Sequence, residues 1–172
     1  MKKNIVPVAR ERKMREEDFI VSKTDTKGRI TYANRVFMAF AGYDEAGLLG
    51  VQHNVIRHPD MPRGVFKQMW ETLQAGHEFF GYVKNLASDG SFYWTFANVT
   101  PTHGPHGETI GYFSVRRKPS ADALARIEPL YMAMRRREDE VGPRDAVTAS
   151  RRMLDEFWQS GHESYDHFVL SL

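Results

Sequence analysis

The chain has 172 residues, of which 41% are apolar and 12% aromatic, enough to bury the core of one domain with helical extensions. Lys and Arg number 24 against 22 Asp and Glu, and this near balance, with a net charge of +2, argues against nucleic acid as the main partner. The sequence has no cysteine, which excludes disulfides and thiolate chemistry, and no apolar run long enough to span a bilayer, so we expect a soluble, cytoplasmic protein without a membrane span.

The N-terminal part predicts a charged cap, a β-hairpin and then short helices. Residues 1–18 end in a dense run of opposite charges, typical of an exposed cap. A turn signal at Asp25–Gly28 separates two apolar runs, which predicts a strand on each side of it. Asn34 is a favourable N-cap for the first short helix, and Asp44 can cap a second one.

One stretch of nine residues, Asn54–Pro62, is unusual in its chemistry. It places a cation, an imidazole and a carboxylate within four residues, as Arg57, His58 and Asp60. Its two prolines disfavour a regular helix. The stretch is either a polar surface loop before the next helix or part of a binding site.

The middle of the chain predicts one longer helix and three more strands. Apolar residues at helical spacing favour a helix that starts at Pro62, ends before Gly76 and carries Phe66 and Trp70 on its apolar face. The strands are expected over residues 79–86, 91–101 and 109–117. This order predicts an α+β fold, a five-stranded antiparallel sheet with short helices on one face and room for a flat ligand between the layers.

The remaining residues predict a helical extension. Ser120 can cap a helix that Pro129 is expected to break or kink, and a second amphipathic helix follows over 144–160. The expected division is an N-terminal cap over 1–18, a sheet domain over 19–118 and helices over 119–172. These helices either pair in a homodimer or fold back over the sheet, through an apolar stripe made of Leu124, Ile127, Leu130 and Met134.

Several short motifs, taken with the element order, point to a known family. They are Ile30–Asn34, Ala41–Tyr43, Gly50–Asn54, Arg57–Pro62, Met69–Trp70, Val83–Asn85, Asp89–Gly90, Tyr93–Trp94, Asn98–Pro101, Gly111–Tyr112 and Glu128–Tyr131. Together they resemble a PAS sensor domain, and more narrowly the FAD-binding PAS domain of bacterial aerotaxis receptors. The resemblance covers roughly residues 19–134.

The resemblance implies a noncovalently bound FAD that serves as a redox signal for oxygen or electron-transport state. It implies signal transduction in chemotaxis rather than catalysis. Those receptors continue into a membrane anchor and a signalling region, and this sequence contains neither. We therefore expect the signal to pass to a separate partner protein such as a chemoreceptor or kinase.

The resemblance also implies which residues face the flavin ring. Asn34 and Asn85 match motif positions whose amides suit the ring's alternating donors and acceptors. Phe66 and Trp70 can pack on the ring's apolar face. Two plainer readings stay open: Asn34 as a helix cap, and Trp70 as an ordinary core residue.

The polar run is expected to hold the ADP half of the cofactor. Arg57 suits the pyrophosphate, His58 a phosphate or the ribose, and Asp60 the ribose hydroxyls, with Asn54 beside them. His53 can approach the flavin edge. FAD is preferred over FMN because this run lies outside the expected ring cavity.

Other classes of function leave fewer signals. A haem-binding gas sensor has seven histidines available but no obvious axial ligand, and His103 and His106 lie in a Gly/Pro loop. A light-driven cysteine adduct is excluded by the absence of cysteine. We find no nucleophile–base pair, so neither an enzyme nor a metal site is expected. A ligand-free interaction module stays open.

Overall fold

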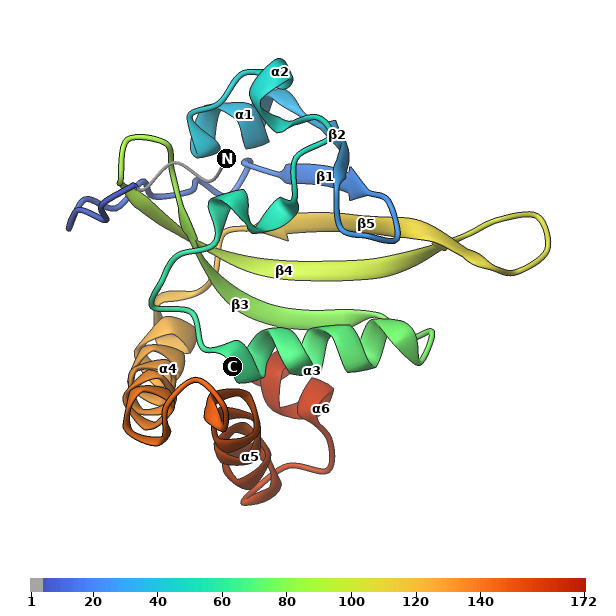
Figure 1. Ribbon diagram of the computed structural model, residues 1–172. Helices are drawn as coiled ribbons and strands as arrows, with labels where there is room; N and C mark the ends of the chain where they lie inside the picture. Colours follow the sequence, from blue (N-terminus) through green and yellow to red (C-terminus); the bar gives the residue numbers. More distant parts are fainter. Residues whose placement is uncertain (1–4) are drawn as a thin grey trace.

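The computed structural model describes residues 5–172 (Figure 1), so the first four residues of the expected N-terminal cap lie outside the described residues. The rest of the segment is not helical. It runs beside the start of β4, where Val8 N donates to Gly90 O at 2.8 Å and Arg12 N donates to Phe92 O at 2.7 Å. The charges of this segment serve that attachment, since both Arg10 and Arg12 pair with Asp89.

A five-stranded antiparallel sheet forms the centre of the molecule, as the turn signals predicted. Its strands stand in the order β2-β1-β5-β4-β3, so β5 joins the N-terminal hairpin to the later meander. Their bounds are β1 (Ile20–Thr24), β2 (Ile30–Ala33), β3 (Phe79–Leu86), β4 (Phe92–His103) and β5 (Thr109–Arg117). β4 is longer than expected because its pairing with β5 continues to His103.

Four helical segments connect β2 to β3 over one face of the sheet (Figure 1). Asn34 and Asp44 cap the first two as predicted, each accepting a backbone N–H three residues on. α3 follows Pro62, which holds the cap position rather than the first helical one. The segments are α1 (Arg35–Ala41), α2 (Glu45–Leu48), the 3-10 helix η1 (His53–Ile56) and α3 (Arg63–Gln74).

Three further helices gather beside α3 and the edge strand β3 (Figure 1): α4 (Ala121–Val141), α5 (Ala146–Gln159) and α6 (Tyr165–Leu170). Tyr131 of α4 donates its hydroxyl to Tyr82 O at 3.0 Å. Of the two arrangements left open, the structure shows these helices folded back on their own chain. Ile127, Leu130 and Met134 of the apolar stripe are buried there, so they do not form a free dimer surface.

Of the break or kink predicted at Pro129, the break is wrong, because α4 is one continuous helix that contains this proline. A proline inside a helix costs about 3 kcal/mol through a lost hydrogen bond and a steric clash. Burying one large apolar side chain returns about 1.5–3 kcal/mol. Ile127, Leu130 and Tyr131 are all buried around the proline, so packing maintains the helix.

α3 and α5 cross unusually closely at Gly64. A Cβ on this residue would lie 2.5 Å from Arg151 N, so a side chain has no room there. The same crossing supplies partners for the free N–H groups at the start of α3. Gly64 N donates to Ser150 Oγ at 2.9 Å, and Arg63 N donates to Glu138 Oε1. Residues of α4 and α5 therefore cap α3.

Candidate ligand-binding cavity

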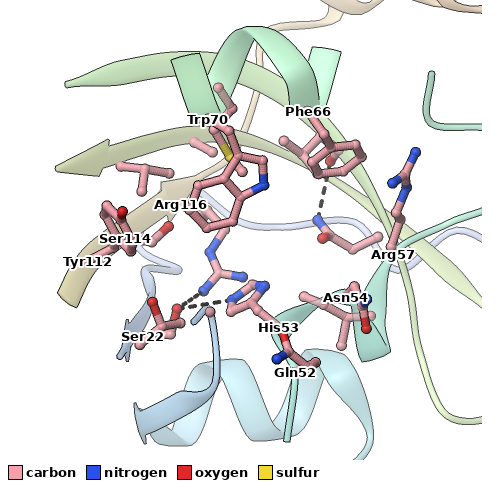
Figure 2. A pocket seen from close by; sticks show the side chains of 18 of the residues that line it. Ser22, Gln52, His53, Asn54, Arg57, Phe66, Trp70, Tyr112, Ser114 and Arg116 are labelled. Atoms are coloured by element: carbon pink, nitrogen blue, oxygen red, sulfur yellow. Dashed lines mark hydrogen bonds between the residues drawn. The ribbon is translucent and has the colours of Figure 1, made fainter. Parts of the chain in front are cut away.

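A cavity of about 270 Å³ lies between the inner face of the sheet and the segments η1 and α3 (Figure 2). Its apolar walls come from α3 and from the strands opposite. α3 contributes Phe66, Met69, Trp70 and Leu73, and the strands contribute Val83, Ala97 and Val99. Trp70 meets Tyr112 edge-on, with ring centroids 5.4 Å apart and planes at 77°. This is a slot with apolar walls, suited to a flat ring.

Asn85 places an amide in the wall of this slot, as the sequence predicted. The side chain is 3% exposed and lies on β3, with Nδ2 donating to Thr95 Oγ1 at 3.3 Å and to Val83 O at 3.2 Å. A buried amide carries both donor and acceptor capacity. Asn85 therefore offers the cavity a polar group fixed on a rigid strand.

Arg57 lies at the edge of the cavity and joins η1 to the sheet. Its backbone pairs with Asn85, and its guanidinium lies 4.0 Å from the centroid of the Phe66 ring. Nη2 donates to Met61 O at 3.1 Å, and burial lowers the pKa of the side chain. His53 and Asn54 line the cavity from the same segment. Part of the predicted polar run therefore does reach the site.

His58 and Asp60 belong to the same run but do not line the cavity. His58 is 3% exposed, lies edge-on to Phe92, and accepts a hydrogen bond from Asp60 N at its Nδ1. Burial lowers the pKa of His58 to about 4, so it is neutral at pH 7. Asp60 pairs with Lys84 at 2.6 Å. In this arrangement both residues stabilise the loop. Their expected contacts to the ADP half of a cofactor, which would lie outside the ring cavity, stay predictions.

The expected ring contact of Asn34 is corrected by the structure. Its Oδ1 accepts from Phe37 N at 2.9 Å and from Val21 N at 3.1 Å. Its Nδ2 donates to Phe19 O at 2.8 Å. The amide is engaged by three backbone groups and does not line the cavity, so Asn34 acts as the helix cap and ties α1 to β1.

The sequence reasoning missed a polar cluster at the sheet side of the cavity, formed by Ser22, His53 and Arg116 (Figure 2). Arg116 donates from Nη2 to Ser22 Oγ, and Ser22 Oγ lies 3.2 Å from His53 Nε2. Burial, with the charge of Arg116, lowers the pKa of His53 to about 3. His53 is thus neutral, and its Nε2 shares a hydrogen bond with the Ser22 hydroxyl.

Strand alternation could have revealed this cluster. Tyr112, Ser114 and Arg116 recur at every second position of β5, which places all three on one face. A cation on the inner face of a sheet is uncommon and signals a specific role. The sequence analysis read β5 only as the last strand.

The part of the chain that the structure describes shows no grouping of three metal-ligating side chains. His103 and His106 are both exposed at the β4–β5 end, as expected for that loop. Across residues 5–172, no helix has the length and apolarity needed to cross a membrane.

A family model described as PAS fold matches residues 30–116, from β2 to β5 with every cavity-forming helix between them. The chain belongs to the PAS family. Over 119 residues it is 40% identical to the aerotaxis receptor of Escherichia coli K12, and this alignment covers 69% of the present chain and 23% of the receptor. It is 34% identical over 97 residues to the nitrogen fixation regulatory protein of Klebsiella pneumoniae, covering 56% of this chain and 20% of that protein.

Solved structures agree with the PAS assignment at the level of the fold. A light-oxygen-voltage domain studied with a flavin analogue aligns with a TM-score of 0.56 and 22% identity, over 63% of this chain and 82% of that one. The light-state LOV domain of Aureochrome1 aligns with a TM-score of 0.55 and 20% identity, and the alignment covers 70% of this chain and 92% of that one. The present chain spans less than a quarter of the length of the two curated relatives.

The comparisons support the coarse functional expectation. The two relatives are a receptor and a regulatory protein, which supports a sensory signalling role for this PAS domain. The resemblance to the aerotaxis-receptor domain, suggested by the motifs, is confirmed. The nature of any cofactor and the placement of its contacts stay predictions.

Proposed function

We propose that this PAS domain binds FAD noncovalently in the cavity and relays the redox state of the flavin to a partner protein, as an aerotaxis-like sensor. The observation that carries the proposal is the apolar slot between α3 and the sheet, with the Asn85 amide in its wall. Sequence identity of 40% to an aerotaxis receptor supports it. A bound flavin supplies a ring that accepts and releases electrons.

The residues of the cavity suit the parts of such a cofactor. Phe66 and Trp70 offer aromatic surface to a ring, and Asn85 offers its amide to the ring's polar edge. His53 and Asn54 close the slot from η1. These side chains exclude water from the ring and fix its orientation.

Arg57 supports FAD over FMN. It stands where η1 leaves the cavity, and within residues 5–172 it forms no ion pair with a carboxylate. An unpaired guanidinium is a strong and geometrically specific partner for phosphate oxygens. A pyrophosphate leaving the slot at this point would neutralise it.

α3 supports the relay. One side of this helix lines the cavity, while its start is capped by Glu138 and Ser150 of the C-terminal helices. A change in the contacts between the ring and α3 would therefore alter the packing of α3 against α4 and α5. We expect a cytoplasmic homodimer that passes this change to a separate signalling protein such as a chemoreceptor or kinase.

The deciding experiment is the absorption spectrum of the purified protein, with chromatography of the cofactor released by heat. A flavin spectrum and released FAD are expected. A Soret band would replace the proposal with haem sensing. Colourless protein that takes up no FAD during refolding would make it a ligand-free interaction module.

The relay has its own test, limited proteolysis of oxidised and anaerobically reduced protein. The loop between α4 and α5, at Gly142–Asp145, is expected to change its cleavage rate with redox state. Identical cleavage patterns, circular dichroism and crosslinking in the two states would contradict the relay while leaving the cofactor assignment in place.

A further inference from the structure

Arg116 is a buried cation whose hydrogen-bonding capacity is mostly unused. It is 2% exposed on β5, and its guanidinium carbon lies 4.6 Å from the centroid of the Phe37 ring. Nη2 donates to Ser22, whereas Nε and Nη1 are buried without an acceptor. No Asp or Glu among residues 5–172 lies within ion-pair distance of it.

This arrangement is among the more costly ones in a protein interior. A buried charge normally needs a counter-ion, and buried donors normally need acceptors. Burial lowers the pKa of Arg116 to about 10, which leaves the side chain charged at pH 7. The folded chain therefore holds a positive charge next to an apolar slot without neutralising it.

Its neighbours in the chain do not supply the missing partner. Ser22 Oγ accepts one hydrogen bond from Arg116 and shares another with His53 Nε2. His53 is neutral, because burial lowers its pKa. Tyr93 is also buried without a partner for its hydroxyl, and burial raises its pKa, so it carries no negative charge. The acceptors that fit Arg116 must therefore come from the contents of the cavity.

We propose that Arg116 recognises the pyrimidine ring of the bound flavin, donating from its free N–H groups to the ring's carbonyl oxygens and nitrogens. This inference rests on the proposed function and assigns the polar end of the same site. Arg116 fixes which end of the ring faces the sheet, while Asn85 contacts the ring from β3. Its charge also favours electrons on the ring, so it raises the midpoint potential of the cofactor.

Two substitutions separate the charge of Arg116 from its planar donors. Arg116→Met removes both while keeping an unbranched side chain, and Arg116→Lys keeps the charge alone. The matched control is Arg117→Met, since Arg117 is the next residue of β5, is exposed, and lies over Phe96 outside the cavity. Each protein is stripped of flavin and compared for thermal midpoint, FAD affinity by fluorescence quenching, and midpoint potential.

We expect Arg116→Met to leave the thermal midpoint of the flavin-free protein unchanged or higher, because an unpaired buried charge is removed. FAD affinity should fall on the order of tenfold to a hundredfold, the loss typical of hydrogen bonds to a charged group. The midpoint potential of the bound flavin should become more negative. This potential is measured by a reductive titration, in which dithionite supplies the electrons and is oxidised to sulfite. The flavin ring gains the electrons, and no covalent bond to Arg116 is made or broken.

Arg116→Lys should weaken FAD binding but leave the midpoint potential close to that of the wild-type protein. Arg117→Met should change neither the affinity nor the potential. If Arg116→Met does not fold, the Arg116→Lys variant decides alone, and wild-type FAD affinity in that variant overturns the inference. If Arg116→Met folds, wild-type FAD affinity together with a wild-type midpoint potential overturns the inference. A flavin-free Arg116→Met protein with a lower thermal midpoint but unchanged FAD binding overturns it as well. These results leave FAD binding itself intact, whereas a wild-type protein that takes up no FAD overturns the proposed function and this inference together.

Discussion

Arg57 shows how one side chain can serve both the fold and a ligand. Its guanidinium lies over Phe66 and donates to Met61 O, so its stem and one N–H are fixed by the chain itself. An arginine held in this way loses less freedom when it binds an anion. The residue is therefore preorganised for the pyrophosphate of the proposed cofactor.

Replacing Arg57 by Ala is expected to reduce FAD retention on purification by about tenfold or more, the value of a hydrogen bond to a charged group. The sheet should stay folded, because the backbone pairing of Arg57 with Asn85 does not need the side chain. The flavin-to-protein absorbance ratio measures the loss. Lys67→Ala, which removes an exposed cation of α3, is the control. Full flavin occupancy in Arg57→Ala would contradict the assignment of this residue.

His53 and His58 make stability depend on pH. Burial holds the pKa of His53 at about 3 and that of His58 at about 4, whereas an unfolded histidine titrates near 6.5. The unfolded chain thus binds more protons below about pH 6.5. Both contributions are complete above that pH and are lost as pH falls toward the folded values.

We therefore expect the free energy of unfolding to decrease by about 2 kcal/mol for each histidine between pH 7 and pH 5. Urea titrations across this range measure the slope. His58→Gln should remove about half of it, and His106→Gln, in an exposed loop, should leave it unchanged. A flat profile in the wild-type protein would mean that these imidazoles are not buried as neutral groups.

α3 is the element on which two parts of the molecule depend. It supplies one wall of the cavity, and the backbone N–H groups of its first turn donate hydrogen bonds to Glu138 and Ser150. Such capping from other helices is possible only because Gly64 lets α5 approach the backbone of α3. The close crossing, rather than local helix propensity, fixes where α3 starts.

Gly64→Ala should destabilise the protein by about 1–3 kcal/mol, the usual cost of overpacking, because the new methyl group meets backbone atoms of α5. Chemical denaturation measures this cost. Gly161→Ala is the matched control, since open space surrounds Gly161. Equal stability of the two variants would show that the helices can separate without loss.

Pro129→Ala should stabilise the protein by about 1–2 kcal/mol. Pro129 is exposed inside a continuous helix, so the substitution restores a backbone hydrogen bond and removes no buried contact. Thermal and urea unfolding measure the gain. A loss of stability would mean that α4 needs a bend at this residue to reach the core.

At the scale of the whole molecule, the described helices and sheet form two apolar cores. One surrounds Phe37 and Tyr93 between the hairpin and the first helices, and the other joins α3, β3 and the C-terminal helices. The cavity lies where α3 and the inner sheet face meet. The C-terminal extension is thus part of the folded unit, which agrees with a role in passing a change of α3 to a partner.

The sequence was sufficient for features that depend on neighbours along the chain. Turn residues at Asp25–Gly28 and the cap residues Asn34 and Asp44 are local signals, and each predicted its element. The apolar spacing of α3 likewise predicted that Phe66 and Trp70 share a face, and both line the cavity.

Features that depend on distant contacts could not be predicted in this way. Pro129 reads as a helix breaker until the burial of Ile127 and Leu130 is known. Asn34 matched a family motif, but its amide is occupied by backbone groups of Phe19, Val21 and Phe37. The environment of Arg116 is made by β1, η1 and α1, three segments that are remote in the chain.

The position of Trp70 gives the protein a built-in optical reporter. Trp70 is one of three tryptophans and lines the cavity beside Tyr112. Trp94 instead packs near Tyr131, and Trp158 donates to Asp155. A flavin in the slot would accept excitation energy or an electron from the nearby indole and so quench the fluorescence of Trp70. Occupancy of the site could then be followed in unlabelled protein, in real time and at submicromolar concentration.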